Sequence, residues 1–167
     1  MPNVLILRGF GGILLAKGMD NLANKIRKLN NIDNCYIDEY FNWLYWSETV
    51  KNSKEQFVLI GHSFGANAIL KLIRLLHYKN FEKCFLFDCS PYTSFLINQI
   101  GSGTVPENIK EVFNFYQHDD LLVQGATLTR NNGSVENIHN MKYAANHIGI
   151  DDLNEPHEII LNRILGK

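Results

Sequence analysis

The sequence predicts an α/β fold: a three-layer sandwich with about six mostly parallel strands and helices on both faces. Short apolar runs of strand length alternate with segments of helical period along the 167 residues. This alternation is typical of a parallel sheet whose strands are joined by crossover helices. The chain has no internal repeat or low-complexity linker, so we expect one domain over residues 1–167. The expected strands are Val4–Leu7, Cys35–Ile37, Phe57–Ile60, Cys84–Phe87, Val112–Tyr116 and, more weakly, Val135–His139.

Helical periodicity identifies three of the segments between and after these strands. Residues near 17–30 carry their apolar side chains on one stripe, which indicates an amphipathic helix. Residues near 64–78 are apolar on most sides and leave only a narrow polar stripe, which predicts a helix buried against the sheet. A third helical segment, near 155–166, follows the last predicted strand.

Composition and charge narrow the classes of partner. The net charge of −1 gives no electrostatic reason to expect nucleic acid or an anionic membrane surface. No apolar stretch is long enough to span a bilayer, and no basic segment of a secretory signal precedes the first strand, so we expect no membrane insertion. The cysteines Cys35, Cys84 and Cys89 are odd in number, which favours free thiols and a cytoplasmic location. The oligomeric state stays open.

The pattern that carries chemistry is Gly61-His62-Ser63-Phe64-Gly65, between a predicted strand and the predicted buried helix. A tight strand-to-helix turn exposes a serine hydroxyl to a base and a substrate, with strained backbone at the serine. The following helix directs its first N–H groups at a developing oxyanion. A Gly-rich phosphate-binding turn is the alternative, but the chain lacks the P-loop lysine and the three-glycine dinucleotide pattern. Ser63 is therefore the candidate nucleophile.

A serine nucleophile needs a base, and the base needs an acid that orients it. Ligands bind beyond the carboxyl ends of strands in open α/β sheets. Asp119 and Asp120 follow one late strand, and His147 follows the last. Asp88, at the end of an earlier strand, is a further candidate acid, and His139 in the last strand is a rival base. The other histidines are His62 within the Gly61–Gly65 turn, His118 beside the site, and His77 and His157, which are expected on the surface.

The chain resembles the α/β-hydrolase superfamily in three features, which occur in this order: the nucleophile elbow Gly61–Gly65, the run Asp120-Leu121-Leu122-Val123, and His147 before a terminal helix. More closely, the chain resembles the minimal, lidless bacterial lipases and the small serine hydrolases of similar length. The resemblance covers almost the whole chain and implies a triad of Ser63, His147 and Asp120. The superfamily's Asp-x-x-Val pattern favours Asp120 over Asp119, although some lipases place the acid one strand earlier, where Asp88 lies.

The same resemblance implies a minimal α/β-hydrolase fold that lacks the superfamily's first two strands and a lid. The strand at Cys35 would then form one edge of the sheet, and the strand at Val4 would lie inside it. The short segment after Cys84–Phe87 leaves no room for a substantial lid, so we expect no increase in rate when substrate forms an interface.

In this superfamily the oxyanion loop follows the first central strand, where the chain reads Arg8-Gly9-Phe10-Gly11-Gly12. The superfamily usually has His-Gly here, so Arg8 is a departure that leaves the support of the loop open. The resemblance implies that the backbone N–H groups of Phe10 and Phe64 form the oxyanion hole. The residues expected to contact substrate are Gly9, Tyr92, Leu121 and Ile148. Further candidates for an open apolar cleft are Ile13, Leu14, Pro91 and Leu122, of which Ile13 and Leu14 are equally compatible with the core.

These features predict an enzyme that hydrolyses carboxylic esters of short to medium acyl length through an acyl-enzyme. A thioester or an amide would use the same residues, and a hydrolase fold kept as a binding module without turnover is the alternative from another class. Cys89 follows a strand, but nothing near it in the sequence resembles a thiolate-activating environment. No Cys/His cluster has metal-ligand spacing, so we expect no metal, no cofactor, and a small-molecule ester as the partner.

Overall fold

A computed structural model describes residues 2–30, 32–89, 104–120 and 125–167, with Ile13 described in its backbone alone. Its main sheet has the order β2-β1-β3-β4-β6-β8, and each of these neighbouring pairs is parallel. The six strands are β1 (Asn3–Arg8), β2 (Cys35–Glu39), β3 (Phe57–His62), β4 (Phe81–Phe87), β6 (Ile109–Tyr116) and β8 (Ile138–Lys142). Two short strands, β5 (Thr104–Val105) and β7 (Thr129–Arg130), pair with each other.

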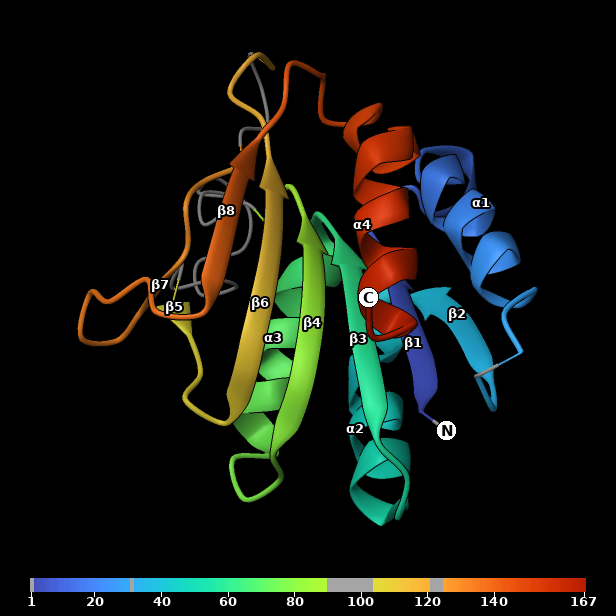
Figure 1. Ribbon diagram of the computed structural model, residues 1–167, viewed down its shortest axis with the longest axis vertical. Coiled ribbons are helices and arrows are strands. Elements are labelled where there is room, and N and C mark those ends of the chain that lie inside the picture. The colour runs from blue at the N-terminus through green and yellow to red at the C-terminus, as the bar shows by residue number, and fades with distance from the viewer. Residues whose placement is uncertain (1, 31, 90–103, 121–124) are drawn as a thin grey trace.

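Helices cover both faces of the sheet, which confirms the predicted three-layer architecture (Figure 1). One face carries α1 (Lys17–Ile26) and α4 (Asn154–Ile164), and the other carries α2 (Trp43–Asn52) and α3 (Phe64–Leu75). Three short 3₁₀ helices lie in the connections: η1 (Gly12–Leu14), η2 (Tyr40–Asn42) and η3 (Ile150–Asp152). No helix in these described ranges is long and apolar enough to cross a membrane.

The apolar core consists of two layers, one on each side of the sheet. Successive side chains of a strand point to opposite faces, so β1 directs Leu5 and Leu7 toward α2 and α3, and Val4 and Ile6 toward α1 and α4. Every residue of β1 and β3 is buried. Near-continuous burial is the environment that central parallel strands require.

The predicted sheet order is confirmed at its first edge, since β2 is the edge strand and β1 lies inside it. The last strand differs from the prediction because it begins at Ile138 rather than Val135. Val135 lies in a turn, where its carbonyl accepts a hydrogen bond from the Ile138 N–H, and its side chain is exposed. Helix α2 was not among the segments identified by periodicity, since its buried stripe includes the polar Ser47.

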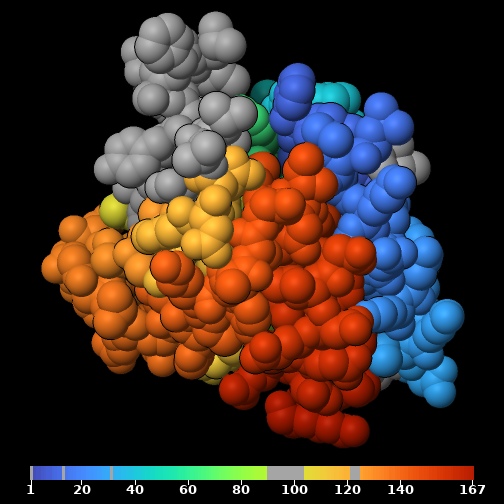
Figure 2. Space-filling model, turned by 90° about the horizontal axis from the view of Figure 1, so that it is seen from above, coloured from blue at the N-terminus to red at the C-terminus, as the bar shows by residue number. Residues whose placement is uncertain are grey.

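Because the strands are parallel, their carboxyl ends share one edge of the sheet, at the top of Figure 1. Hydrogen bonds extend the ladder one residue beyond β3 and β4: Ser63 N–H donates to Phe87 O at 2.8 Å, and Asp88 N–H to Phe115 O at 2.7 Å. Viewed onto this edge, the C-terminal segment lies between α1 and the segment of β8 (Figure 2). The candidate site residues after β3, β4 and β8 therefore meet at one end of the molecule.

Candidate active site

Ser63 occupies the sharp turn between β3 and α3. Its backbone has φ 56° and ψ −119°, a conformation that a residue with a side chain rarely adopts. The turn is closely packed, since a Cβ added to Gly65 would lie 1.9 Å from Leu7 O. A glycine at this position therefore lets the start of α3 approach β1, and it fixes where the serine lies.

The Ser63 hydroxyl lies next to the imidazole of His147. The distance from Ser63 Oγ to His147 Nε2 is 2.9 Å, and that from His147 Nδ1 to Asp88 Oδ2 is 2.5 Å. Asp88 is fully buried and follows β4 directly, whereas His147 lies in the connection between β8 and η3. The structure thus brings a hydroxyl, an imidazole and a carboxylate into one hydrogen-bonded series.

The carboxylate at the imidazole is not Asp120, so the sequence prediction for this contact is corrected. Asp120 Oδ2 instead accepts a hydrogen bond from the backbone N–H of His147 at 3.3 Å. The N–H groups of Asp119 and Asp120 both donate to Gln117 Oε1, at 2.7 and 2.8 Å, which turns this part of the loop back toward β6. Asp88 needs no such turn, since it lies directly at the end of its strand.

Gln117, which the sequence analysis did not single out, surrounds the Asp88 carboxylate with donors. Its backbone N–H donates to Asp88 Oδ1 at 3.2 Å, and its side-chain Nε2 donates to Asp88 Oδ2 at 2.7 Å. Gly125 covers the carboxylate, since a Cβ there would lie 2.0 Å from Asp88 Oδ1. A buried carboxylate is costly without such partners. A polar residue directly after an apolar strand is the signal that could have identified Gln117.

His62 supports His147 from below. Its Nε2 lies 2.9 Å from the backbone oxygen of His147, and the two ring centroids are 5.0 Å apart. A carbonyl can only accept, so Nε2 of His62 carries the proton. Burial, and after it the nearby charge of His147, lowers the pKa of His62 to about 4. A neutral His62 therefore fixes the His147 carbonyl without adding a charge to the site.

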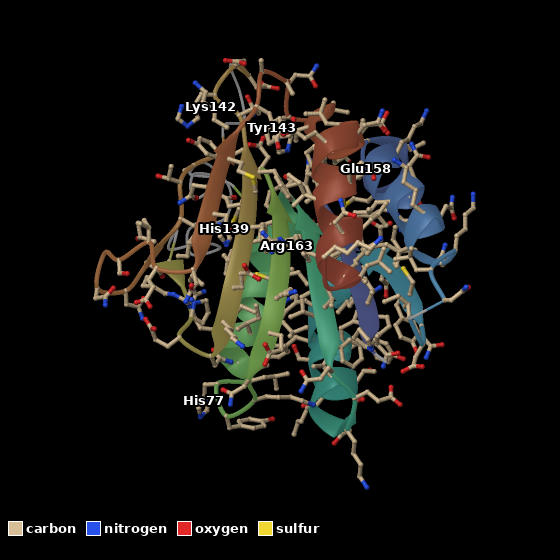
Figure 3. All side chains as sticks on the ribbon, in the orientation of Figure 1. His77, His139, Lys142, Tyr143, Glu158 and Arg163 are labelled. Carbon is tan, nitrogen blue, oxygen red and sulfur yellow. The ribbon has the colours of Figure 1, made fainter. Side chains whose placement is uncertain are left out.

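The remaining histidines lie away from Ser63 or serve other contacts. His139 lies partway along β8, with its Nε2 3.0 Å from Glu111 Oε1, and His77 lies toward the opposite end of the molecule (Figure 3). The His118 ring packs on Tyr116. The expectation that His157 is a surface residue is wrong, because it is buried with Nε2 2.7 Å from Asp151 O.

The loop after β1 passes directly beside the serine. A Cβ added to Gly9 would lie 2.8 Å from Ser63 Cβ and 3.4 Å from Ser63 Oγ. Phe10, next in the chain, is mostly exposed, and its ring centroid lies 6.4 Å from that of Phe64, the first residue of α3. The two residues expected to supply backbone N–H groups to an oxyanion are thus neighbours at the serine.

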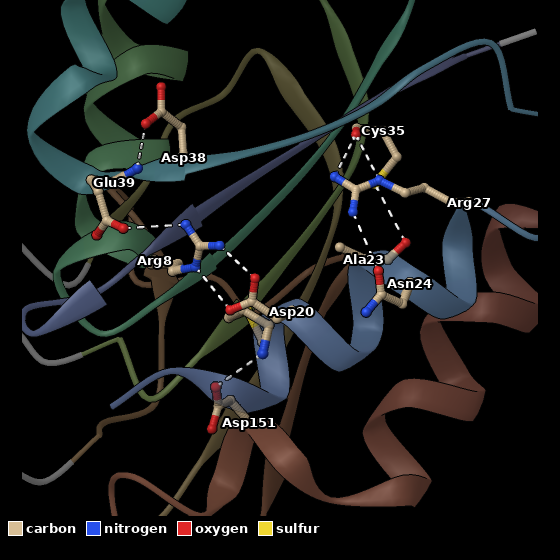
Figure 4. Close-up of polar contacts among 10 residues, drawn as sticks. Arg8, Asp20, Ala23, Asn24, Arg27, Cys35, Asp38, Glu39 and Asp151 are labelled. Carbon is tan, nitrogen blue, oxygen red and sulfur yellow. Dashed lines mark hydrogen bonds and ion pairs between the residues drawn. The ribbon is translucent and has the colours of Figure 1, made fainter. Parts of the chain in front are cut away.

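Arg8 provides the support for this loop that the sequence left open. Its guanidinium donates to both carboxylate oxygens of Asp20, at 3.0 and 2.5 Å, and to Glu39 Oε1 at 3.2 Å (Figure 4). The hydrogen bond to Asp20 is the largest cause of a raised pKa at Arg8. The ion pairs tie the end of β1 to α1 and β2. A Cβ at Gly12 would lie 2.6 Å from the Glu39 carboxylate, so the loop packs directly on this cluster.

A row of aromatic side chains extends from the serine. Ring centroids of Tyr40 and Phe64 lie 5.3 Å apart, and those of Tyr40 and Phe41 lie 5.6 Å apart. Leu14 is exposed rather than part of the core, and Ile148, beside His147, is 51% exposed. The other predicted lining residues lie outside what the structure describes: Pro91, Tyr92, Leu121, Leu122 and the side chain of Ile13.

The cysteines do not offer an alternative nucleophile. Cys35, Cys84 and Cys89 are all free. Burial raises the pKa of Cys89 to about 12, which is the opposite of thiolate activation. In the described part of the chain, no group of three His, Cys, Asp or Glu side chains could hold a metal ion.

Comparisons with known proteins identify the fold. Neither a protein-family model nor a curated protein matches the sequence. Among solved structures, a YdeN-like hydrolase from Pectobacterium atrosepticum matches with a TM-score of 0.64 and 12% identity, over 99% of this chain and 91% of that one. Est1E from Butyrivibrio proteoclasticus matches with a TM-score of 0.66 and 11% identity, over 99% and 89%.

A hydrolase of the α/β superfamily from Xanthomonas campestris matches with a TM-score of 0.58 and 10% identity, over 98% of this chain and 99% of that one. At this identity the similarity establishes the fold. The chain has the fold of small α/β-hydrolases over nearly its whole length.

Proposed function

We propose that this protein hydrolyses carboxylic esters through an acyl-enzyme on Ser63, with His147 as general base and Asp88 as the acid that orients it. The observation that carries the proposal is the unbroken series from Ser63 Oγ to His147 Nε2 at 2.9 Å and from His147 Nδ1 to Asp88 Oδ2 at 2.5 Å. Both distances are within hydrogen-bond reach of a working triad.

The hydrogen bonds fix where the protons lie. An ionised carboxylate only accepts, so Nδ1 of His147 carries the proton that faces Asp88. Nε2 is then unprotonated and accepts the Ser63 hydroxyl proton. This tautomer is the one that a general base requires.

Catalysis then proceeds in two steps. Ser63 Oγ attacks the ester carbonyl carbon while its proton passes to His147 Nε2, and the proton passes on to the departing alkoxide, which leaves as the alcohol. Water attacks the acyl-enzyme in the same way, gives its proton to His147, and releases the acid as Ser63 regains its proton. The backbone N–H groups of Phe10 and Phe64 are proposed to hold the oxyanion, a contribution worth about 10²–10³ in kcat per donor in comparable sites.

The aromatic row formed by Phe10, Phe64, Tyr40 and Phe41 supports an apolar acyl group. Such a group gains about 0.8 kcal/mol for each CH₂ that it buries, until the apolar surface ends. We expect activity to peak at short to medium acyl length and not to rise when substrate forms an interface. Thioesters and amides are compatible with the same residues.

A hydrolase fold retained for binding alone is the competing proposal. The strained backbone of Ser63 argues against it, since a conformation that costs about 1–3 kcal/mol persists where function requires it. A fluorophosphonate probe distinguishes the two proposals because it reacts only with an activated serine.

The test combines labelling with turnover. Wild-type protein should take up one fluorophosphonate on Ser63 and hydrolyse p-nitrophenyl esters of varied chain length. Ser63→Ala should abolish labelling and lower turnover by several orders of magnitude with folding intact. The matched control is Ser134→Ala, which removes a hydroxyl in the connection between β7 and β8 that accepts a hydrogen bond from Glu136 N–H. Labelling that persists in Ser63→Ala would overturn the proposal.

A further inference from the structure

Building on the proposed hydrolysis, we propose that Gln117 is a positioning residue that aims the Asp88 carboxylate at His147 and stabilises its charge. Gln117 is fully buried at the end of β6 and contacts Asp88 with both its backbone and its side chain. Its role is distinct from that of Asp88, since it does not touch the imidazole or the serine.

The orientation of the Gln117 amide follows from its neighbours. The N–H groups of Asp119 and Asp120 can only donate, so the atom that faces them at 2.7 and 2.8 Å is the oxygen Oε1. The NH₂ group is therefore the end that faces Asp88 Oδ2 at 2.7 Å. In a flipped amide, the NH₂ group would face the N–H donors of Asp119 and Asp120, and the oxygen would face the Asp88 carboxylate. Both contacts would be repulsive.

The resulting contacts close a circuit around the imidazole. Gln117 binds Asp88, Asp88 binds the His147 ring, the His147 backbone N–H binds Asp120, and the Asp120 N–H binds Gln117. The Gln117 amide thus positions Asp88, which contacts the ring of His147, and also the loop that carries Asp120, which contacts the backbone of His147. The geometry couples the aim of Asp88 to the position of His147.

Asp88 Oδ2 accepts from Gln117 Nε2 and from His147 Nδ1 at the same time. A hydrogen bond to the charged form of a carboxylate favours that form. Without the Gln117 donor, the carboxylate concentrates more negative charge on the imidazole and takes up a proton more readily. Both effects make the Asp88–His147 pair bind its proton at higher pH, so the acid limb of the kcat/KM profile should move upward.

The first test variant is Gln117→Met, which keeps the length of the side chain and removes its hydrogen bonds. We expect kcat to fall about 10- to 100-fold with KM within about twofold. The midpoint of the acid limb of kcat/KM should rise by at least about half a pH unit. The matched control is Asn114→Leu, which removes a buried amide from β6, the strand that Gln117 follows, where the amide bonds Ala126 O and Asn140 Oδ1. This control should lower stability and leave the midpoint unchanged.

Gln117→Glu covers the case in which Gln117→Met fails to fold. The glutamate keeps an oxygen for the Asp119 and Asp120 N–H groups but places a second carboxyl group against Asp88. Two facing carboxyl groups hold a proton tightly, so kcat should again fall and the midpoint should rise. A folded variant of either kind with an unchanged midpoint would reduce Gln117 to a structural residue and overturn the proposal.

The design separates this inference from the proposed function. If wild-type protein shows no labelling or turnover that depends on Ser63, the proposed function fails. The titration of the His147 ring, followed by NMR in wild type and in Gln117→Met, still tests whether Gln117 acts on the pair. If wild type is active and the ring titrates at the same pH in both proteins, only the role of Gln117 fails.

Discussion

His147 contacts two carboxylates from different strands through different atoms: its ring Nδ1 meets Asp88 Oδ2 at 2.5 Å, and its backbone N–H meets Asp120 Oδ2 at 3.3 Å. The ring contact can select a tautomer, whereas the backbone contact can only hold the loop in place. Mutation can separate the two, because only the ring contact takes part in the proposed proton transfer.

We expect Asp88→Asn to lower kcat on the order of 10⁴-fold with the fold retained. An asparagine at this position can donate to Nδ1 and so favours the wrong tautomer of His147. Asp120→Asn should stay within about threefold of wild type, since the amide oxygen still accepts from the His147 N–H, and Asp119→Asn should be equally mild. Ester turnover by the three variants, at equal folded fraction by circular dichroism, is the measurement. A larger loss of turnover in Asp120→Asn than in Asp88→Asn would mean that the acid of the triad is Asp120, in the loop after β6.

Much of the fold could be predicted from the sequence, because buried parallel strands are nearly continuous apolar runs. β1 and β3 are buried along their whole length and stand out in the sequence for that reason. The boundary of β8 could not be predicted, since the apolar Val135 is exposed in a turn. Local composition did not distinguish that turn from the start of a strand.

The candidate site was predictable where it depends on a local turn, and not where it depends on contacts between distant segments. The elbow around Ser63 is specified by five consecutive residues, and the sequence placed His147 correctly beyond the last strand. The choice among Asp88, Asp119 and Asp120 depends on how the loop after β6 folds back onto Gln117. That turn is made by a side-chain amide bonding to two backbone N–H groups, which no periodicity reveals.

The close approach of Gly9 to the serine predicts that this position does not tolerate a side chain. A Cβ would lie 2.8 Å from Ser63 Cβ and 2.9 Å from His62 O, so the backbone must move. Gly9→Ala should lower kcat on the order of 10²-fold, because a small displacement of this loop would misplace the N–H group of Phe10 that is proposed to bind the oxyanion. Gly133→Ala is the control, since a Cβ there meets nothing within 4 Å although its φ is 79°. It should cost about 1 kcal/mol of stability and no activity.

The Arg8 cluster predicts a stability effect that a surface ion pair would not show. Arg8→Met leaves Asp20 and Glu39 partly buried without their cation and should destabilise the fold by about 1–3 kcal/mol. Lys51→Met breaks an exposed pair with Glu48 and should stay within about 0.5 kcal/mol. Urea denaturation measures both.

Adding Asp20→Asn and Glu39→Gln to Arg8→Met should recover part of the lost stability, because the unpaired charges are removed. Recovery of stability without recovery of kcat would fit a cluster that also positions the loop after β1. An Arg8→Met variant as stable as Lys51→Met would contradict the proposed support.

The burial of the Asp151 carboxyl group leads to a prediction of how stability depends on pH. Its side chain is fully buried, its Oδ2 accepts from the Met19 N–H at 3.2 Å near the start of α1, and its Oδ1 has no partner among the described residues. Burial is the largest cause that raises its pKa from 3.8 to about 7. Below about pH 4 the carboxyl group is protonated in both states and costs nothing. Between about pH 4 and pH 7 the unfolded state loses the proton first, so the contribution of this group to stability falls as pH rises.

Asp151→Asn removes this titration and keeps an oxygen for the Met19 N–H. The free energy of unfolding of the variant minus that of wild type should therefore rise between about pH 4 and pH 7, by on the order of 2–4 kcal/mol, and level off above. Asp152→Asn, at the exposed neighbour that accepts from Asn21 Nδ2, is the control and should give a much flatter difference. Urea denaturation from pH 4 to pH 8 measures the three proteins. A difference for Asp151→Asn that is flat over this range would mean that Asp151 ionises in the folded protein as readily as in the unfolded chain.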